Sequence, residues 1–475
     1  MSRINTNVAA LTAQRGLERS QKGLNDTLQR LSTGLRINRG ADDPAGLIAS
    51  EGLRSEISGL TQAIDNSQRA ANVIATAEGA LGEVASLLLS IKSLVVEAAN
   101  TGALSPEEIN ANQIQVDSAI ESITRIANAT TFAGLKLVNG SLDYITSGVN
   151  TTDISSLRVT QANFGTAAFQ PVEVNVITSA RTAELQFRAS AVTGGGLTLE
   201  VRGTGGVESL SFTSNASVSA ILFAVNQVSD ATGVAAAYIN SGNPASGITF
   251  NSNDYGSSQF VAVRAQSGAF ATVDENGNAS NRQVGQDAVA TINGSQAVAD
   301  GRNISLNTVT LDVDIRLDES FGIGTTSFAV TGGGALFQLG PQVSTAQQVG
   351  LAIQSIAATA LGDDEVGFLN SLRTGGTAEL RDNPRGASRI LETAIRQVAV
   401  LRGRLGAFER NTLDTNVNSL QVSLENVTSS ESAIRDADFA AETAALTRAQ
   451  ILTQAGTSVL ATANTTPQNV LSLLQ

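Results

Sequence analysis

The chain has 475 residues, enough for roughly two to four domains of ordinary size, and it contains neither Cys nor His. It can therefore form no disulfide, no Ser-His-Asp or Cys-His catalytic group and no Cys/His zinc or iron site. Its formal net charge of -13 and its scattered, unclustered arginines disfavour nucleic acid as a partner.

The first apolar pattern predicts a helix that ends near Gly40. Its members, at helical spacing, are Ile4, Val8, Leu11, Leu24, Leu28, Leu31 and Leu35. Asp42, Asp43 and Pro44 then supply an N-cap and a proline at the first position of a second helix.

The strongest helical signal runs from about residue 43 to residue 100. Its apolar residues recur in steps of three and four, and they are Leu53, Ile57, Leu60, Ile64, Ala71, Ile74, Leu81, Val84, Leu88, Ile91, Val95 and Ala98. This spacing is typical of a coiled-coil-like seam. Such a helix would be about 85 Å long, which is unusual for a compact domain.

A third helix begins with Ser105, Pro106 and Glu108, which together form a capping box with proline at the first helical position. Between about 140 and 380 the sequence changes to Gly, Ser, Thr, Asn and short β-branched runs. Segments 197–201 and 308–315 predict strands, whereas segments 217–228 and 346–357 predict short helices. We therefore expect a β-rich insert with minor helix.

The helical pattern returns at about residue 384. The first seam consists of Ala387, Leu391, Ala394, Val398, Leu401, Leu405 and Phe408. A one-residue phase slip near Asn411 and Thr412, like a stutter in a coiled coil, resets the seam to Leu413, Val417, Leu420, Leu424, Val427 and Ile434. After Asp438 only Glu442 and Arg448 carry charge.

The fold class that follows is a multidomain α+β protein, in which long terminal α-helices form coiled-coil-like bundles and a β-rich insert occupies the centre. Each arm carries an apolar stripe that cannot stay exposed to water, and the nearest partner is the other arm. The length of the helices and the nearly uncharged end favour further burial between copies of the chain. We expect the segment from Ala449 to Leu474 to pack only in a polymer.

Five segments at the two ends of the chain form a specific pattern: 31–38 (Leu-Ser-Thr-Gly-Leu-Arg-Ile-Asn) and 42–47 near the start, and 432–439, 449–461 and 467–474 near the end. In these segments the chain resembles bacterial flagellin, the subunit of the flagellar filament. The centre matches the family more weakly, although residues 286–294 resemble a small insert motif found in many flagellins.

The resemblance implies five parts. Residues 1–42 and 437–475 would be the inner-core helices around a central channel, residues 43–140 and 381–436 the surrounding spoke helices, and residues 141–380 a β-rich surface region of one or two subdomains. It implies a structural protein that polymerises into the filament used for swimming. We expect no enzymatic activity, no cofactor and no metal.

The same resemblance assigns residues to self-assembly. The inner-core set is Ile4, Val8, Leu11, Leu24, Leu28, Leu31, Ile451, Leu452, Ala455, Val459, Leu460, Val470, Leu471, Leu473 and Leu474. The spoke-packing set is Leu53, Ile57, Leu60, Ile64, Ile74, Leu81, Leu88, Leu391, Val398, Leu401, Leu405, Phe408, Leu420 and Leu424.

The implied partners are further copies of the chain in a helical homopolymer, an export chaperone at the C-terminal segment, the filament cap and hook-filament junction proteins, and the flagellar type III export apparatus. The implied location is extracellular, reached without a cleaved signal peptide, because the first residues lack the apolar region of a signal. We expect no nucleic acid partner. We also expect no membrane insertion, because no uninterrupted apolar run is long enough to span a bilayer.

Many flagellins are recognised by an innate immune receptor through an Arg-x-Arg-Glu-Leu patch on the long helix. This chain has Ser90, Ile91, Lys92, Ser93 and Leu94 at that place. A single Lys cannot reproduce the bidentate and charge-assisted contacts of two Arg and one Glu. We therefore expect weak or absent receptor activation.

Several alternatives stay open at the level of sequence. The hook-filament junction protein shares such terminal helices, and a minor filament protein could carry an adhesive centre, although no strong aromatic platform is evident. A zinc protease insert is excluded because the chain has no His. The acidic groups at 42–43, 274–278 and 363–365 are interpreted as helix caps and turns rather than catalytic or metal sites.

Overall fold

The computed structural model describes residues 6–165, 167–192, 194–308 and 310–472, the last seven of these by their backbone only. Contacts divide the chain into two compact units. The first comprises Met1–Arg69, Gln338–Gln347 and Arg410–Gln475, and the second comprises Ala70–Phe337 and Gln348–Glu409. The long terminal helices and β-rich centre confirm the predicted α+β fold class.

Helix α1 (Val8–Thr33) is shorter than the sequence predicted. Asn7 caps its start by accepting a hydrogen bond from the backbone N–H of Ala10 at 3.0 Å. The helix ends before Gly34, which adopts the left-handed conformation at φ +71° and donates its N–H to the carbonyl of Arg30 at 2.8 Å. The prediction of an end near Gly40 is therefore wrong, because Gly34 closes the helix before that point.

The caps predicted for the next two helices are confirmed. Helix α2 (Pro44–Ala98) begins with Pro44, and the Asp43 carboxylate accepts the N–H of Gly46 at 2.9 Å. Helix α3 (Pro106–Ala129) has the full capping box, in which Ser105 and Glu108 satisfy each other's backbone N–H groups. The backbone N–H of Ser105 is also the main reason that the Glu108 pKa lies below its ordinary value.

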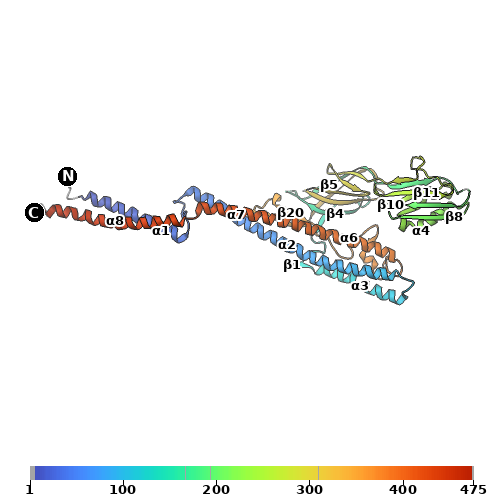
Figure 1. Cartoon of the computed structure of the whole chain (residues 1–475), viewed down its shortest axis with the longest axis horizontal. Helices are drawn as coiled ribbons and strands as arrows, with labels where there is room; N and C mark the ends of the chain where they lie inside the picture. The colour runs from blue at the N-terminus through green and yellow to red at the C-terminus, as the bar shows by residue number, and fades with distance from the viewer. Residues whose placement is uncertain (1–5, 166, 193, 309, 473–475) are drawn as a thin grey trace. The chain divides into compact units, whose positions relative to one another are not determined.

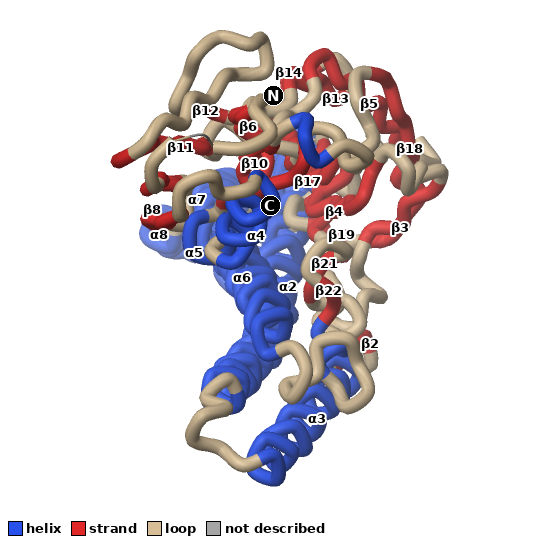
Figure 2. The backbone as a smooth tube through the Cα atoms, turned by 90° about the vertical axis from the view of Figure 1, so that its right-hand side faces the viewer, coloured by secondary structure: helices blue, strands red, loops and turns tan. Residues whose placement is uncertain are grey.

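In the second unit, α2 packs antiparallel to α6 (Pro384–Phe408), with α3 alongside (Figures 1 and 2). Ion pairs mark the alignment: Lys92 Nζ lies 3.2 Å from Glu392 Oε1, and Arg402 Nη2 lies 3.5 Å from Glu78 Oε1. The seam between them contains the buried apolar side chains of Ile74, Leu81, Leu88, Ile91, Leu391, Val398 and Leu405.

In the first unit, the N-terminal part of α2 packs against α7 (Thr415–Arg435) through Leu60, Ala63, Ile64 and Leu420. Between α6 and α7 the chain forms a π-helical segment, Glu409–Asp414. A π turn accommodates one extra residue within a helix. It is the structural form of the one-residue phase slip predicted at Asn411 and Thr412, and it confirms that prediction.

One described helix, α2, is long and apolar enough to cross a membrane by length and composition alone, with a mean hydropathy of 1.6 over an 18-residue window. The core helix of a soluble protein passes the same test. Here the seam side of α2 is occupied, because Leu81, Val84, Leu88 and Ile91 are fully buried against protein.

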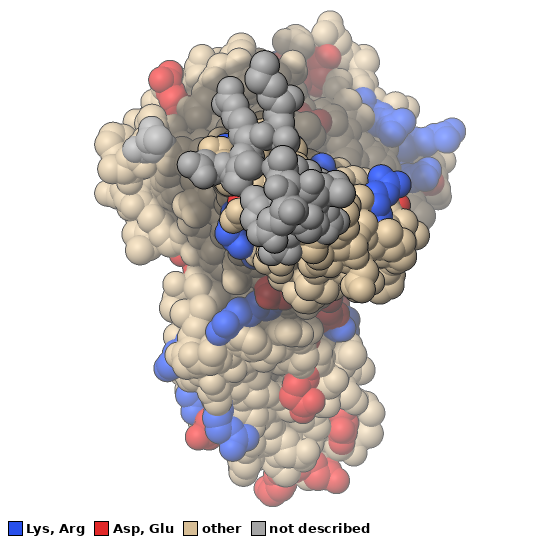
Figure 3. Space-filling view, turned by 90° about the vertical axis from the view of Figure 1, so that its left-hand side faces the viewer, with Lys and Arg blue, Asp and Glu red and all other residues tan. Residues whose placement is uncertain are grey.

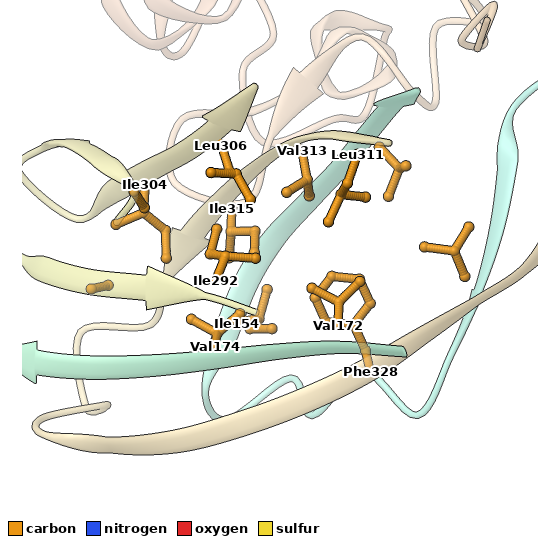
Figure 4. Packing of buried hydrophobic residues seen from close by; sticks show 14 of the residues in the cluster. Ile154, Val172, Val174, Ile292, Ile304, Leu306, Leu311, Val313, Ile315 and Phe328 are labelled. Atoms are coloured by element: carbon orange, nitrogen blue, oxygen red, sulfur yellow. The ribbon is translucent and has the colours of Figure 1, made fainter. Parts of the chain in front are cut away.

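The central region contains two hydrophobic cores. The first lies between a sheet of order β14-β13-β5-β18-β3 and a sheet of order β15-β16-β17-β4. Figure 4 shows Val172, Val174, Ile292, Val313 and Phe328 pointing toward one another from both sheets. These strands are β3 (Tyr144–Ser147), β4 (Ile154–Ala162), β5 (Gln170–Thr178), β13 (Val289–Ile292), β14 (Ser295–Gln296), β15 (Val298–Asp300), β16 (Asn303–Asn307), β17 (Leu311–Leu317) and β18 (Gly324–Gly333).

The second core lies between two further sheets and helix α4 (Val218–Gln227). The sheet orders are β6-β10-β9 and β12-β11-β7-β8. Their strands are β6 (Thr182–Phe187), β7 (Leu197–Arg202), β8 (Val207–Phe212), β9 (Val234–Tyr238), β10 (Ile248–Tyr255), β11 (Phe260–Ser267) and β12 (Arg282–Val284). The strand predicted at 197–201 and the helix predicted at 217–228 are therefore confirmed.

The strand predicted at 308–315 is confirmed for its larger part, because β17 covers Leu311–Leu317, but the strand begins at Leu311 rather than at Thr308. Thr308 donates its N–H and its hydroxyl to the carbonyl of Leu311. Segment 346–357 is not a helix but contains strand β20 (Gln348–Leu351), which pairs with β19 (Ala335–Gln338). Just after β20, Ala352 and Ile353 donate their N–H groups to the carbonyls of Thr160 and Leu142, so pairing with strands replaces helical bonding.

The burial difference between two leucines of α2 leads to a stability prediction. We expect Leu81→Ala, at a side chain with 0% exposure, to lower the free energy of unfolding of the monomer by about 3 kcal/mol, because it leaves a cavity in the seam. The matched control Leu89→Ala, at 59% exposure, should cost less than about 0.5 kcal/mol. Urea denaturation followed by circular dichroism measures both, and equal losses would contradict the seam.

Candidate self-association surface

The two chain ends form an antiparallel helix pair in the first unit (Figure 1). Helix α8 (Phe439–Ser472) lies along α1, with the Asn7 side chain donating to the carbonyl of Ala463 at 2.8 Å. At the other end of the pair, Arg30 Nη1 lies 3.2 Å from Glu442 Oε1. Midway, a Cβ on Gly456 would meet Leu17 at 3.3 Å, so glycine permits the close approach of the helices.

The segments at which the two arms enter this pair are joined through their backbones. Ala437 donates its N–H to the carbonyl of Gly34 at 2.9 Å, and Arg36 donates to the carbonyl of Arg435 at 2.7 Å. These residues belong to the two motifs at 31–38 and 432–439 that carry the sequence resemblance. The fold thus brings the two motifs together as a short antiparallel bridge at Leu35 and Asp436.

Most of the apolar surface of α1 and α8 has no partner within the chain. Across the described part of α1 only Thr27 is buried. The large apolar side chains of the pair with exposures from 47% to 69% are Val8, Leu11, Leu28, Phe439, Ile451, Leu452 and Val459. Helix α8 carries two charged residues, Glu442 and Arg448, whereas α1 carries six, which are Arg15, Glu18, Arg19, Lys22, Asp26 and Arg30. Figure 3 shows Lys, Arg, Asp and Glu side chains scattered among uncharged ones on one face of the molecule. Several large exposed apolar side chains on one helix pair favour an interaction with another protein surface.

The predicted inner-core residues take different places in this pair. Val8, Leu11, Leu28, Ile451, Leu452, Ala455 and Val459 are exposed, and Leu24, Leu31 and Leu460 are half-buried. Ile4, Leu473 and Leu474 lie outside the described residues. Val470 and Leu471 lie in the stretch described by its backbone only.

The predicted spoke residues lie in the seams of α2. Leu60, Ile64, Ile74, Leu81, Leu88, Leu391, Val398, Leu401, Leu405 and Leu420 are buried, whereas Leu53, Ile57, Phe408 and Leu424 are half-buried. Sequence reasoning missed a second group of apolar side chains on the outer faces of these helices. Ile48, Leu89, Val96, Ile114 and Val422 are 59% to 76% exposed. In the sequence, these residues differ from the seam residues only because they fall outside the three-four spacing.

Only part of the segment at 90–94 is accessible. Ile91 is fully buried in the seam, and Lys92 is paired with Glu392. Ser90 and Ser93 are exposed, and Leu94 is half-buried. Ser90 donates its hydroxyl to the backbone carbonyl of Ser86 at 3.0 Å, within its own helix.

The acidic groups considered as possible sites act in caps and turns. The backbone N–H groups of Arg39 and Asn38 bond to the Asp42 carboxylate and hold its pKa below the ordinary value. The Asn278 amide does the same to the pKa of Asp274 across a turn. Within the described residues, no group of three or more Asp, Glu, His or Cys side chains is arranged to hold a metal ion.

Two long-helix arms that close on each other, leave one apolar surface uncovered and display a β-rich insert define a self-associating structural subunit. Comparison with known proteins gives the family. The model of the bacterial flagellin N-terminal helical region matches residues 4–143, and that of the C-terminal helical region matches residues 389–474.

Curated relatives match along the whole chain. The chain is 30% identical to B-type flagellin of Pseudomonas aeruginosa and 30% identical to flagellin of Salmonella rubislaw, in both cases over 99% of this chain and 99% of the relative. The chain therefore belongs to the bacterial flagellin family and is a structural subunit of the flagellar filament.

A solved structure of the flagellar cap protein FliD D2-D3 domains from Escherichia coli also matches, at 19% sequence identity over 39% of this chain and 97% of that chain. Its TM-score of 0.29 is too low to indicate a shared overall fold.

The exposed side chains of α8 give the second prediction. We expect Val459→Glu to raise the critical concentration for polymerisation more than about tenfold, because it replaces an apolar contact by a charge that burial penalises. The matched control Gln454→Glu, which adds the same charge at an exposed polar position of the same helix, should change it less than about threefold. Sedimentation of polymer from monomer at graded concentrations measures the effect, and equal shifts would contradict a specific apolar contact.

Proposed function

We propose that the chain polymerises by burying the exposed apolar surfaces of α1 and α8 against the same helices of neighbouring copies. Burial of one Val, Leu or Ile side chain contributes about 1.5 to 3 kcal/mol. The exposed set on α1 and α8 could therefore contribute on the order of 10 kcal/mol per subunit, before the entropic cost of association is subtracted. The exposed fractions of Leu11, Ile451 and Val459 are the observation that carries this proposal.

We further propose a layered arrangement in the polymer. Residues 1–42 and 437–475 would form the inner core, residues 43–140 and 381–436 the spokes around it, and residues 141–380 the outer surface. The contrast in burial supports this order, because most seam residues of α2 are buried within one chain whereas most large apolar side chains of α1 and α8 are not. Leu89, Val96 and Ile114 would then provide lateral contacts between spokes.

We propose a purely structural role, without catalysis, for this subunit. The absence of Cys and His from the sequence and the use of Asp42, Asp274 and Asp363 in turns support this reading. The subunit would be exported unfolded through the flagellar type III apparatus with a chaperone on its C-terminal segment. It would assemble outside the cell between the cap and the hook-filament junction proteins.

Hydrogen exchange tests the coupling of order to assembly. We expect amides of residues 449–472 to exchange rapidly in dilute monomer and to become protected at least about a hundredfold in filaments, because the helix loses most of its apolar partners in the monomer. Amides of residues 74–88, in the buried seam of α2, should be protected in both states. Protection of residues 449–472 in dilute monomer that equals the protection of α2 would contradict the proposal.

A receptor assay tests the segment at 90–94. We expect the natural chain to activate the innate receptor weakly, because Ser90 and Ser93 offer no charge-assisted contact. The triple variant Ser90→Arg, Lys92→Arg, Ser93→Glu should raise a cellular reporter response about tenfold or more. A natural chain as potent as a flagellin with the full Arg-x-Arg-Glu-Leu patch would contradict this prediction.

A further inference from the structure

One exposed sheet face in the central region gathers three arginines that lie far apart in the sequence. In the sheet β12-β11-β7-β8, Arg282 lies opposite Ala262, and Ala262 lies opposite Arg202, so the three form one row across three strands. Residues directly opposite each other point to the same face. Arg264 lies two residues along β11 from Ala262 and therefore joins this face.

The opposite face of the sheet is core, and this one is solvent. Leu199, Val201 and Val261 are fully buried in the second core. Their neighbours Arg202, Arg264 and Arg282 are exposed. Strands lie about 4.8 Å apart and successive same-face residues about 7 Å apart, so the three Cα atoms fall within about 10 Å of the central Ala262.

Phe260 holds two of these arginines in place. The Arg282 guanidinium lies 4.7 Å from the centre of the Phe260 ring, and the Arg202 guanidinium lies 6.0 Å from it. A stacked guanidinium keeps its N–H groups free to donate at its edges. The stack thus orders two long side chains before any ligand arrives.

These guanidiniums lack the partners that other central arginines have. Arg181, Arg302 and Arg316 form ion pairs with Glu275, Glu365 and Asp363. No ion pair or side-chain hydrogen bond joins the guanidiniums of Arg202, Arg264 or Arg282 to another described residue. Glu200 lies opposite Arg264 on this face, but its carboxylate accepts a hydrogen bond from the Gln266 side chain at 2.7 Å rather than from Arg264.

We propose that this face, formed by Arg202, Arg264, Arg282 and Phe260, binds a linear sulfated polysaccharide. Three unpaired guanidiniums provide bidentate donors for strong oxyanions, and they make the face locally cationic in a chain of net charge -13. The small side chain of Ala262 leaves space between Arg202 and Arg282. Thr198, Ser209 and Ser211 lie on the same face, where their hydroxyl groups can bond to the hydroxyl groups of a sugar. A nucleic acid fits less well, because Arg282 already stacks on the ring that a base would use.

The proposal rests on the proposed outward position of residues 141–380 in the filament. Heparin is the probe, and its affinity is measured for full-length monomer and for assembled filaments, with neutral dextran and a single-stranded DNA oligonucleotide as comparisons. Filaments and monomer should both bind heparin, and raising NaCl should weaken the binding. Dextran should not bind, and DNA should bind more weakly than heparin.

Substitutions locate the binding. The variant R202S/R264S/R282S should lose about tenfold or more in heparin affinity. The matched control R181S/R188S/R373S removes the same charge from other exposed positions in the central region and should stay within about twofold of the natural chain. Should the first variant fold poorly by circular dichroism, Arg264→Ser alone, which removes no stacked side chain, should lose about twofold to threefold.

Four outcomes would overturn the proposal: no heparin binding by the natural chain, equal loss in the two triple variants, tighter binding of DNA than of heparin, or binding by monomer but not by filaments. Loss of polymerisation in R202S/R264S/R282S would also overturn it, because the face would then serve contacts between copies. If the natural chain forms no filaments at all, the proposed function fails separately, and the monomer titration still tests the face.

Discussion

The seam along α2 is the interaction on which the rest of the structure depends. One 55-residue helix carries an apolar stripe that α7 covers in the first unit and α6 covers in the second. Because both partners come from the C-terminal arm, closing the seam brings the two ends of the chain together. The residues between the end of α3 and the start of α6 therefore form an insert, and both ends of this insert are joined to the helical framework.

Burial is complete in one part of the helical framework and incomplete in another. Ile74, Leu81 and Leu88 are inaccessible to water, whereas about half or more of Leu11, Ile451 and Val459 is exposed. The first group stabilises a single subunit without help from a second copy. The second group has no comparable burial within the chain, and in the proposed arrangement a neighbouring copy would bury it.

The helical framework could be predicted from the sequence because its causes are local or periodic. Capping residues such as Asp43 and Ser105 act within one turn, and the three-four spacing identifies the buried side of a helix wherever its partner lies. The end of α1 was misplaced because Gly34 breaks a helix whose apolar pattern continues for one more member, Leu35. There the backbone conformation of one residue outweighed the pattern.

The central region was harder to predict because its contacts are not local. Segment 346–357 has the composition of a helix, yet hydrogen bonds to Thr160 and Leu142, far away in the sequence, hold it extended. The sequence likewise shows Arg202, Arg264 and Arg282 as scattered single charges and offers no aromatic platform. Only strand register places the three around Phe260, and register depends on pairing that a periodic pattern does not specify.

The π-helical segment Glu409–Asp414 limits how the length of the C-terminal arm can vary during evolution. In a regular α-helix each residue turns the chain by about 100°, so loss of one residue would rotate every later seam residue of α7 away from α2. A π turn already holds one surplus residue, so loss of one residue within Glu409–Asp414 would leave a regular α-helix whose seam stays aligned with α2. Elsewhere in the arm relatives of this chain should therefore differ by whole heptads, whereas a single-residue gap is tolerated at this segment.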